Sequence, residues 1–175
     1  RPDWVRRVNA MGDACGGAHH VVPLDLEELV GTAVASVGLD DFGDLGDGDW
    51  LTRLRDLLGA VDAARLHVVG RLMTREELLR GLRTRLLLAE QWRRQPGIAA
   101  ERIVAPVVIT GPARSGTSIL FELLALDPGL RGPTAADVLH PAAAEGVDGA
   151  ARHRMAECEQ ELWADVQPEF AAMHE

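Results

Sequence analysis

The sequence predicts an α/β fold. A helical N-terminal extension is expected over residues 1–102, and the start of a domain with a parallel sheet flanked by helices is expected over residues 103–175. In the first part of the chain, apolar residues repeat at helical spacing. In the second part, a compact β-branched run, a glycine-rich loop and another helical pattern follow one another. Strand, glycine loop and helix in that order open many α/β domains.

The composition indicates a soluble globular protein. Of its 175 residues 47% are apolar and 26% charged, enough for one domain with a substantial core. No apolar run approaches the roughly 18–20 residues that cross a bilayer, so no membrane span is expected. The net charge of −9 argues against broad nucleic-acid binding. Because the chain starts at Arg1 and stops at Glu175 within a helical pattern, we expect a piece of a longer, cytoplasmic protein.

Start and stop signals divide the first part into helices and turns. Residues 1–24 are expected to be irregular. Asp25 and Asp49 are placed to cap two helices, with turns over the Asp- and Gly-rich stretch 40–49 between them. Thr74 starts a capping box for a third helix, which Pro96-Gly97 ends. The arginines between the leucines of this helix are expected on a solvated face: Arg80, Arg83, Arg85, Arg93 and Arg94.

The second part opens with a β-branched run. The run Pro106-Val107-Val108-Ile109-Thr110 predicts a fully buried parallel strand. After the glycine-rich stretch 111–118, an amphipathic helix is expected up to Asp127-Pro128. A last helix is expected at about 151–166, with acidic residues facing outward: Glu157, Glu159 and Glu161.

The glycine-rich stretch concentrates the hydroxyl groups of the chain. The whole sequence has three serines and seven threonines, and four of these ten lie within residues 110–118. Glycine lets backbone approach a ligand closely, and a following helix start offers free N–H groups and partial positive charge. Arg114 adds a full charge with fork geometry. These features predict a phosphate-binding loop made of Arg114, Ser115, Gly116, Thr117 and Ser118.

The kind of phosphate follows from the position of the cation. From Gly111, the spacing Gly-x4-Gly-x-Ser is that of the Walker A loop, but Thr117 stands where that loop has Lys. Because that Lys reaches the β and γ phosphates of a nucleoside triphosphate, its replacement argues against an ordinary ATPase or GTPase. The cation lies instead at Arg114, which suits a monophosphate or phosphosulfate group on the helix end.

The segment from Pro112 to Ser118 resembles the 5′-phosphosulfate-binding loop of sulfotransferases, whose usual form is Pro-x-[Lys/Arg]-Ser-Gly-Thr-[Thr/Ser]. The helix that follows, with Asp127-Pro128, looks like the bacterial branch of that family. Arg131-Gly132-Pro133 and Val138-Leu139-His140-Pro141 are similar to its next segment. The likeness covers about residues 1–175 and is specific in the loop. It implies a P-loop-like sulfotransferase core, of which this chain holds the N-terminal part.

The resemblance also implies an activity: transfer of a sulfuryl group from 3′-phosphoadenosine 5′-phosphosulfate (PAPS) to a hydroxyl or amine. The acceptor is expected to be a small molecule, a glycan or a lipid. Arg114 would contact the 5′-phosphate and the departing bridging oxygen, and residues 115–118 would hold the other phosphate oxygens. The adenine and 3′-phosphate sites are expected beyond Glu175, so this piece alone is expected to be inactive.

Two residues are candidates for the general base that takes the acceptor's proton. Asp137 stands where the family often has the Glu of a Trp-Glu pair, and His140 carries an imidazole that can titrate near neutrality. The alternative for Asp137 is a helix-capping or surface residue. The alternative for His140 is a packed or exposed histidine before a proline. The scheme needs no metal, and the six histidines form no ligand set.

Three other classes stay open at this point. A nucleotide kinase or NTPase would bind nucleoside triphosphate with magnesium. A serine hydrolase is suggested by Gly116-Thr117-Ser118, which begins like a nucleophile elbow, although Leu120 replaces its final glycine. A non-catalytic binding fragment would show no cofactor binding even in the full-length protein.

Overall fold

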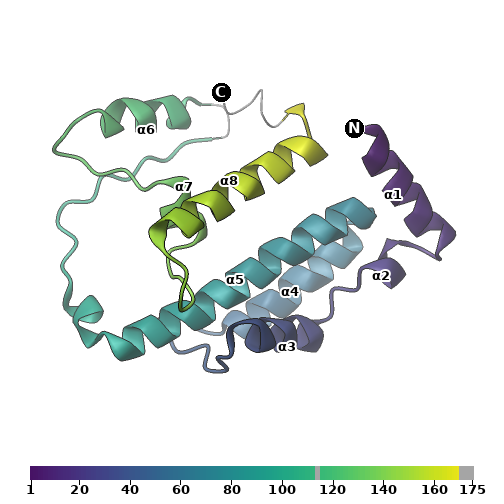
Figure 1. Cartoon of the computed structure of the whole chain (residues 1–175), viewed down its shortest axis with the longest axis horizontal. Helices are drawn as coiled ribbons and strands as arrows, with labels where there is room; N and C mark the ends of the chain where they lie inside the picture. The colour runs from purple at the N-terminus through teal and green to yellow at the C-terminus, as the bar shows by residue number, and fades with distance from the viewer. Residues whose placement is uncertain (113–114, 170–175) are drawn as a thin grey trace.

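The computed structural model describes residues 1–112 and 115–169, and the regular elements in these ranges are all helices. Figure 1 shows the long helix α5 in the middle, α8 running beside it, and α6 standing away from the other helices. In chain order the elements are α1 (Asp3–Ala14), α2 (Ala18–Val21), α3 (Leu26–Val37), α4 (Trp50–Ala63), α5 (Val68–Arg94), the 3₁₀ helix η1 (Pro96–Ala100), α6 (Thr117–Ala125), α7 (Ala135–Leu139) and α8 (Gly149–Val166).

The predicted α/β fold class was wrong, because the described residues contain no strand and no parallel sheet. The run 106–110 is extended chain outside any ladder, and its Val107 and Val108 are 61% and 79% exposed. A strand needs a neighbour that pairs with its backbone N–H and C=O groups. The β-branched run gives a local preference for extended backbone, but no described segment supplies the paired strand.

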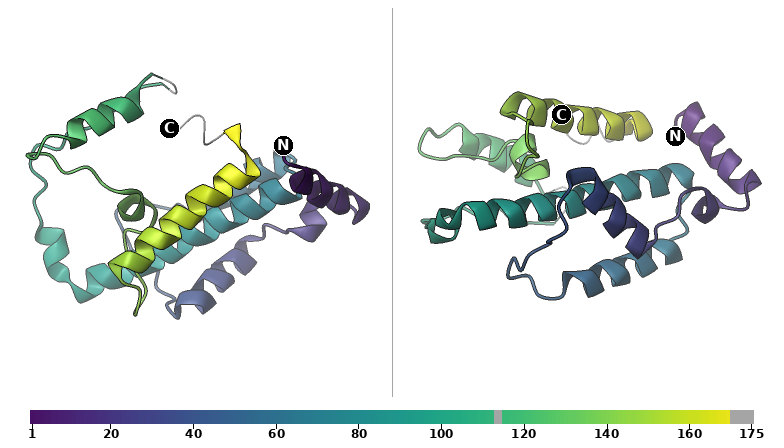
Figure 2. Two further views of the ribbon diagram at one scale, coloured as in Figure 1. Left: turned by 45° about the horizontal axis from the view of Figure 1, so that its top comes forward. Right: turned by 60° about the horizontal axis from the view of Figure 1, so that its bottom comes forward.

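The core lies between α3, α4 and α5, where Leu29 and Leu86 are completely buried. Figure 2 shows α3 and α4 on one side of α5 and α8 on the other. The predicted N-caps of α3 and α4 are confirmed. Asp25 and Asp49 each accept a hydrogen bond from the backbone N–H three residues later, at 2.9 and 3.0 Å. In the described ranges, no helix is both long enough and apolar enough to cross a membrane.

Residues 1–24, expected to be irregular, form the helices α1 and α2. α1 buries only Val5 and Gly12, although Trp4, Val8 and Met11 repeat along it at helical spacing. Gly12 lets the helix approach the start of α5 closely, since a Cβ at this position would lie 2.1 Å from Cγ2 of Val68. α1 is therefore held against α5 by a close contact at a small residue, with little of its apolar face buried.

The capping box expected at Thr74 does not form, because α5 already begins at Val68 after the N-cap residue His67. A capping box is found at α7 instead, between Thr134 and Asp137. The end of α5 at Arg94 agrees with the stop signal at Pro96-Gly97.

The solvated face predicted for the arginines of α5 is only partly correct. Arg93 and Arg94 are exposed and pair with Glu90 on the same helix. The side chain of Arg85, by contrast, is only 12% exposed. Its Nη1 lies 2.6 Å from Oδ2 of Asp47, and its guanidinium stacks on the Trp50 ring. Arginine spacing alone does not show which turns of a long helix are covered by a loop.

Candidate functional site

The predicted phosphate-binding loop ends at the N-terminus of α6. Gly116 is the N-cap residue, with a φ of 89° that favours glycine. Among the described residues, no side chain caps this helix start. The first bond of the helix runs from the N–H of Leu120 to the carbonyl of Gly116 at 3.1 Å. The N–H groups of residues 117–119 can therefore be offered to an external acceptor, and the helix dipole favours an anion there.

The loop before α6 is a tight turn. The N–H of Ser115 donates to the carbonyl of Pro112 at 3.2 Å. A Cβ on Gly111 would lie 2.6 Å from Oγ of Ser115, so only glycine fits there without a shift. Ser115, Gly116 and Ser118 are exposed and Thr117 is half-buried. The open, uncapped turn fits a phosphate group, while Arg114 lies outside the described residues.

A cavity of about 710 Å³ lies beside the start of α6. Ser118 lines it from α6, and Val138 and Leu139 line it from α7. The opposite wall belongs to α5 and α8 and carries the ionisable residues Glu77, Arg80 and Glu159. One hydroxyl of the predicted loop therefore shares an open space with two carboxylates and a guanidinium from distant parts of the chain.

Arg80 joins α5 to α7 and α8. Its Nη1 donates to the carbonyl of Leu139 at 3.3 Å, and its Nε lies 3.7 Å from Oε2 of Glu159. It also pairs with Glu77 one turn earlier on α5. The side chains of Arg80 and Glu159 are only 20% and 26% exposed, so the prediction that both face solvent was wrong. No signal in the sequence marks them, because Glu and Arg at this spacing also occur on exposed helix faces.

Asp137 is held by capping contacts. Its Oδ2 accepts hydrogen bonds from the N–H and the hydroxyl of Thr134, at 3.0 and 2.9 Å. Its Oδ1 accepts one from Nη2 of Arg152 at 3.1 Å. Chiefly through the Thr134 N–H, these donors favour the ionised form and lower the pKa of Asp137 below its usual value. A carboxylate engaged in this way is a weak proton acceptor.

His140 follows α7 and is only 7% exposed. Its Nε2 lies 3.2 Å from Oε1 of Glu159, but without the alignment of a hydrogen bond. Among the described residues, three buried polar atoms of this region lack a hydrogen-bond partner: Nε2 of His140, Oε2 of Glu159 and Nε of Arg152. Such groups are rare in folded proteins and costly to bury. All three residues line a smaller cavity of about 150 Å³ between α5 and α8.

The structure thus brings only some of the predicted site residues together. Ser118 lines the larger cavity, whereas neither Asp137 nor His140 does. Glu159, which the sequence did not single out, lines both the larger and the smaller cavity. Among the described residues, no group of three or more His, Cys, Asp and Glu side chains is arranged to hold a metal ion.

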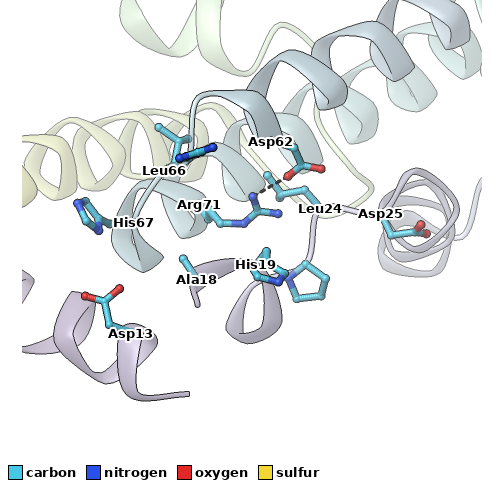
Figure 3. Close-up of a pocket in the computed structure, with 11 residues that line it drawn as sticks. Asp13, Ala18, His19, Leu24, Asp25, Asp62, Leu66, His67 and Arg71 are labelled. Atoms are coloured by element: carbon cyan, nitrogen blue, oxygen red, sulfur yellow. Dashed lines mark hydrogen bonds and ion pairs between the residues drawn. The ribbon is translucent and has the colours of Figure 1, made fainter. Parts of the chain in front are cut away.

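A further cavity, of about 730 Å³, lies at the N-terminal end of α5. Figure 3 shows Arg71 reaching toward Asp62 there, with His19, His67 and Asp13 around it. Arg71 is 4% exposed, and its Nε and Nη1 donate to the carbonyl of Val22 and to Oδ1 of Asp62, both at 2.7 Å. These bonds tie the segment after α2 to α5, so the arginine has a structural role.

With the geometry described, the chain can be compared with known proteins. No family model matches it, and no curated protein does. Among solved structures, however, its fold is sulfotransferase-like. The similar structure is the sulfotransferase STF1 from Mycobacterium tuberculosis H37Rv, with a TM-score of 0.68 and 30% sequence identity. The match covers 84% of this chain but 41% of STF1, so the chain spans well under half of that sulfotransferase.

Proposed function

We propose that this protein transfers a sulfuryl group from PAPS to a hydroxyl or amine of a small molecule, glycan or lipid. The likeness to STF1 supports a transferase of this kind. The proposal that PAPS is the donor rests on the uncapped start of α6. There the backbone of Gly116 is left-handed, and the hydroxyl side chains around it are accessible. This arrangement suits the 5′-phosphosulfate end of PAPS.

Residues 114–118 would have separate roles in the reaction. The N–H groups and hydroxyls of residues 115–118 would hold oxygens of the 5′-phosphate, and Arg114 would stabilise the charge that develops on the bridging oxygen. Transfer between in-line oxygens depends mainly on positioning and on stabilising charge, as in phosphoryl transfer. The bound donor supplies the activated sulfuryl group.

The reaction also needs a group that takes the acceptor's proton. Asp137 and His140 are the candidates from the sequence. The oxygens of Asp137 already accept three hydrogen bonds, whereas Nε2 of His140 has no hydrogen-bond partner among the described residues. Asp137 is therefore the poorer proton acceptor of the two, and His140 is the one that we keep in the proposed mechanism. We also place the protein in the cytoplasm, because Cys15 and Cys158 are exposed thiols that a reducing compartment would keep reduced.

Replacement of Arg114 tests the proposed donor site. Arg114→Ala should remove a charge-assisted contact worth roughly 1.5–3 kcal/mol, and so lower sulfuryl transfer about 10- to 100-fold. The measurement is made on the full-length protein and follows the release of label from [³⁵S]PAPS to water or to p-nitrophenol. Arg154→Ala, which removes the same charge from an exposed position on α8, is the control and should leave the rate unchanged. Unaltered transfer by Arg114→Ala would reject the assigned role.

A further inference from the structure

We infer that Glu159 is the general base of the proposed reaction, with His140 behind it as the positioning residue. The inference rests on the proposed function. It gives the role of general base to a residue that the sequence resemblance does not point to. Glu159 projects from α8 into the cavity that Ser118 lines, and it also lines the smaller cavity with His140. It is the described carboxylate that connects the start of α6 with the candidate histidine.

The contacts of Glu159 leave it able to accept a proton. Its Oε2 is buried without a hydrogen-bond partner among the described residues, and Arg80 Nε stands 3.7 Å from it. Its Oε1 lies 3.2 Å from Nε2 of His140, with poor alignment. Asp137 differs, since three hydrogen bonds hold its carboxylate as a helix cap. Apo hydrogen bonds at catalytic groups are often long or misaligned and tighten only when substrate is bound.

Arg80 gives Glu159 a fixed place beside the cavity. The guanidinium is anchored to the carbonyl of Leu139 at 3.3 Å and paired with Glu77, so it can hold the carboxylate through its Nε. The positive charge of Arg80 would stabilise the ionised carboxylate between turnovers. The remaining charged groups around the pair are Glu76 and Arg83 from α5, Arg152 from α8 and, through Arg152, Asp137 from α7.

In the proposed step, Oε1 of Glu159 accepts the proton of the acceptor hydroxyl while the acceptor oxygen bonds to sulfur. The bond between sulfur and the bridging oxygen breaks, and its electron pair stays on the desulfated nucleotide. The proton can then be shared with Nε2 of His140, only 3.2 Å from Oε1. Charge and atoms balance without any further reactant.

The activity test compares Glu159→Gln with Glu157→Gln, an exposed residue on the same helix. Release of label from [³⁵S]PAPS to water or p-nitrophenol is followed against pH in the full-length protein. A general base contributes about 10²- to 10⁴-fold, so Glu159→Gln should lower kcat at least about 100-fold, with KM for PAPS changed little, and should abolish the acidic limb of the profile. Glu157→Gln should match the unchanged protein. Full kcat in Glu159→Gln would overturn the inference.

A second readout does not depend on turnover. The NMR titration of the His140 imidazole, assigned with His140→Gln, reports the neighbouring carboxylate. Because an anion beside the ring stabilises the imidazolium, Glu159→Gln should lower the titration midpoint, and Glu157→Gln should not. An unchanged midpoint would show that the two side chains are not paired and would overturn the inference.

The remaining outcomes are also decisive. If Glu159→Gln does not fold, as judged by circular dichroism, Glu159→Asp retains the carboxylate but withdraws it by one methylene. A fall in kcat with the acidic limb preserved would then support the inference, and an unchanged kcat would overturn it. If the full-length protein without a substitution releases no label from PAPS, the proposed function itself fails. That result is distinct from a loss seen only in the Glu159 variants.

Discussion

Asp137 shows that the position of a residue in a motif and the role of its side chain can differ. It stands where the resemblance places a catalytic carboxylate, yet it caps α7 and pairs with Arg152. Glu159, which no motif marks, lines the larger cavity together with Ser118. A carboxylate in this part of the fold was predictable from sequence. Which carboxylate faces the cavity was not, because that depends on how α8 packs against α5 and α7.

The cap of α7 can be tested by removing one hydroxyl. Thr134→Ala deletes the acceptor of the Asp137 N–H and one donor to the Asp137 carboxylate. The free energy of unfolding should fall by about 0.5–2 kcal/mol, the usual loss for an N-cap. Urea denaturation measures this loss, with Thr110→Ala, at an exposed position of the extended run before the loop, as the control. Equal stability of the two variants would mean that the cap does not hold α7 in solution.

At the scale of whole elements, the sequence predicted the N-caps of α3 and α4 and the end of α5. It did not predict the start of α5, which has no local capping residue. Asp25 and Asp49 cap α3 and α4 as expected because the interaction is local and spans three residues. α5 begins six residues before the capping box that was expected to start it, and its N-cap His67 makes no side-chain capping bond. The N–H of Val69 instead bonds Oδ1 of Asn9 in α1, at 3.1 Å. A partner 60 residues away leaves no local signal.

The contact between α3 and α5 predicts a pH dependence of stability. Both carboxylate oxygens of Glu28 lie 2.6 Å from guanidinium nitrogens of Arg75, and these bonds lower the pKa of Glu28 below its usual value. Because the folded state favours the ionised form, the pair stabilises the fold above the ordinary carboxyl pKa of about 4.3. The effect is lost as the pH falls through the lower folded pKa.

Glu28→Gln should therefore lower the melting temperature at pH 7 and have a smaller effect at about pH 3, because protonation of the native carboxylate at falling pH removes the ion pair. The loss at pH 7 should stay below about 1 kcal/mol, because the side chain of Glu28 is 44% exposed. Thermal unfolding at the two pH values measures it, and Glu27→Gln, next to it on α3, is the control. A loss of the same size at both pH values would contradict the assigned ion pair.

At the scale of the whole molecule, the helices around α5 form a packed unit, while α6 and the extended run before it present apolar side chains to solvent. Ile119, Leu123 and Leu126 are 57%, 59% and 78% exposed. The sequence shows directly which segments are apolar. The spacing of the apolar residues does not show which other segment packs against them. For this reason the prediction of a buried strand in a sheet was wrong, although the helix after the loop was predicted correctly.

The central claim is that the turn before α6 binds the 5′-phosphate end of the donor nucleotide. Its most direct test is an NMR titration of the ¹⁵N-labelled protein with 3′-phosphoadenosine 5′-phosphate, which detects even weak binding residue by residue. The account predicts that the largest shift changes fall on the amides of Ser115 to Ile119, and that Arg114→Ala but not Arg154→Ala removes them. Changes centred on the cavity around Arg71, or no saturable change at all, would contradict it.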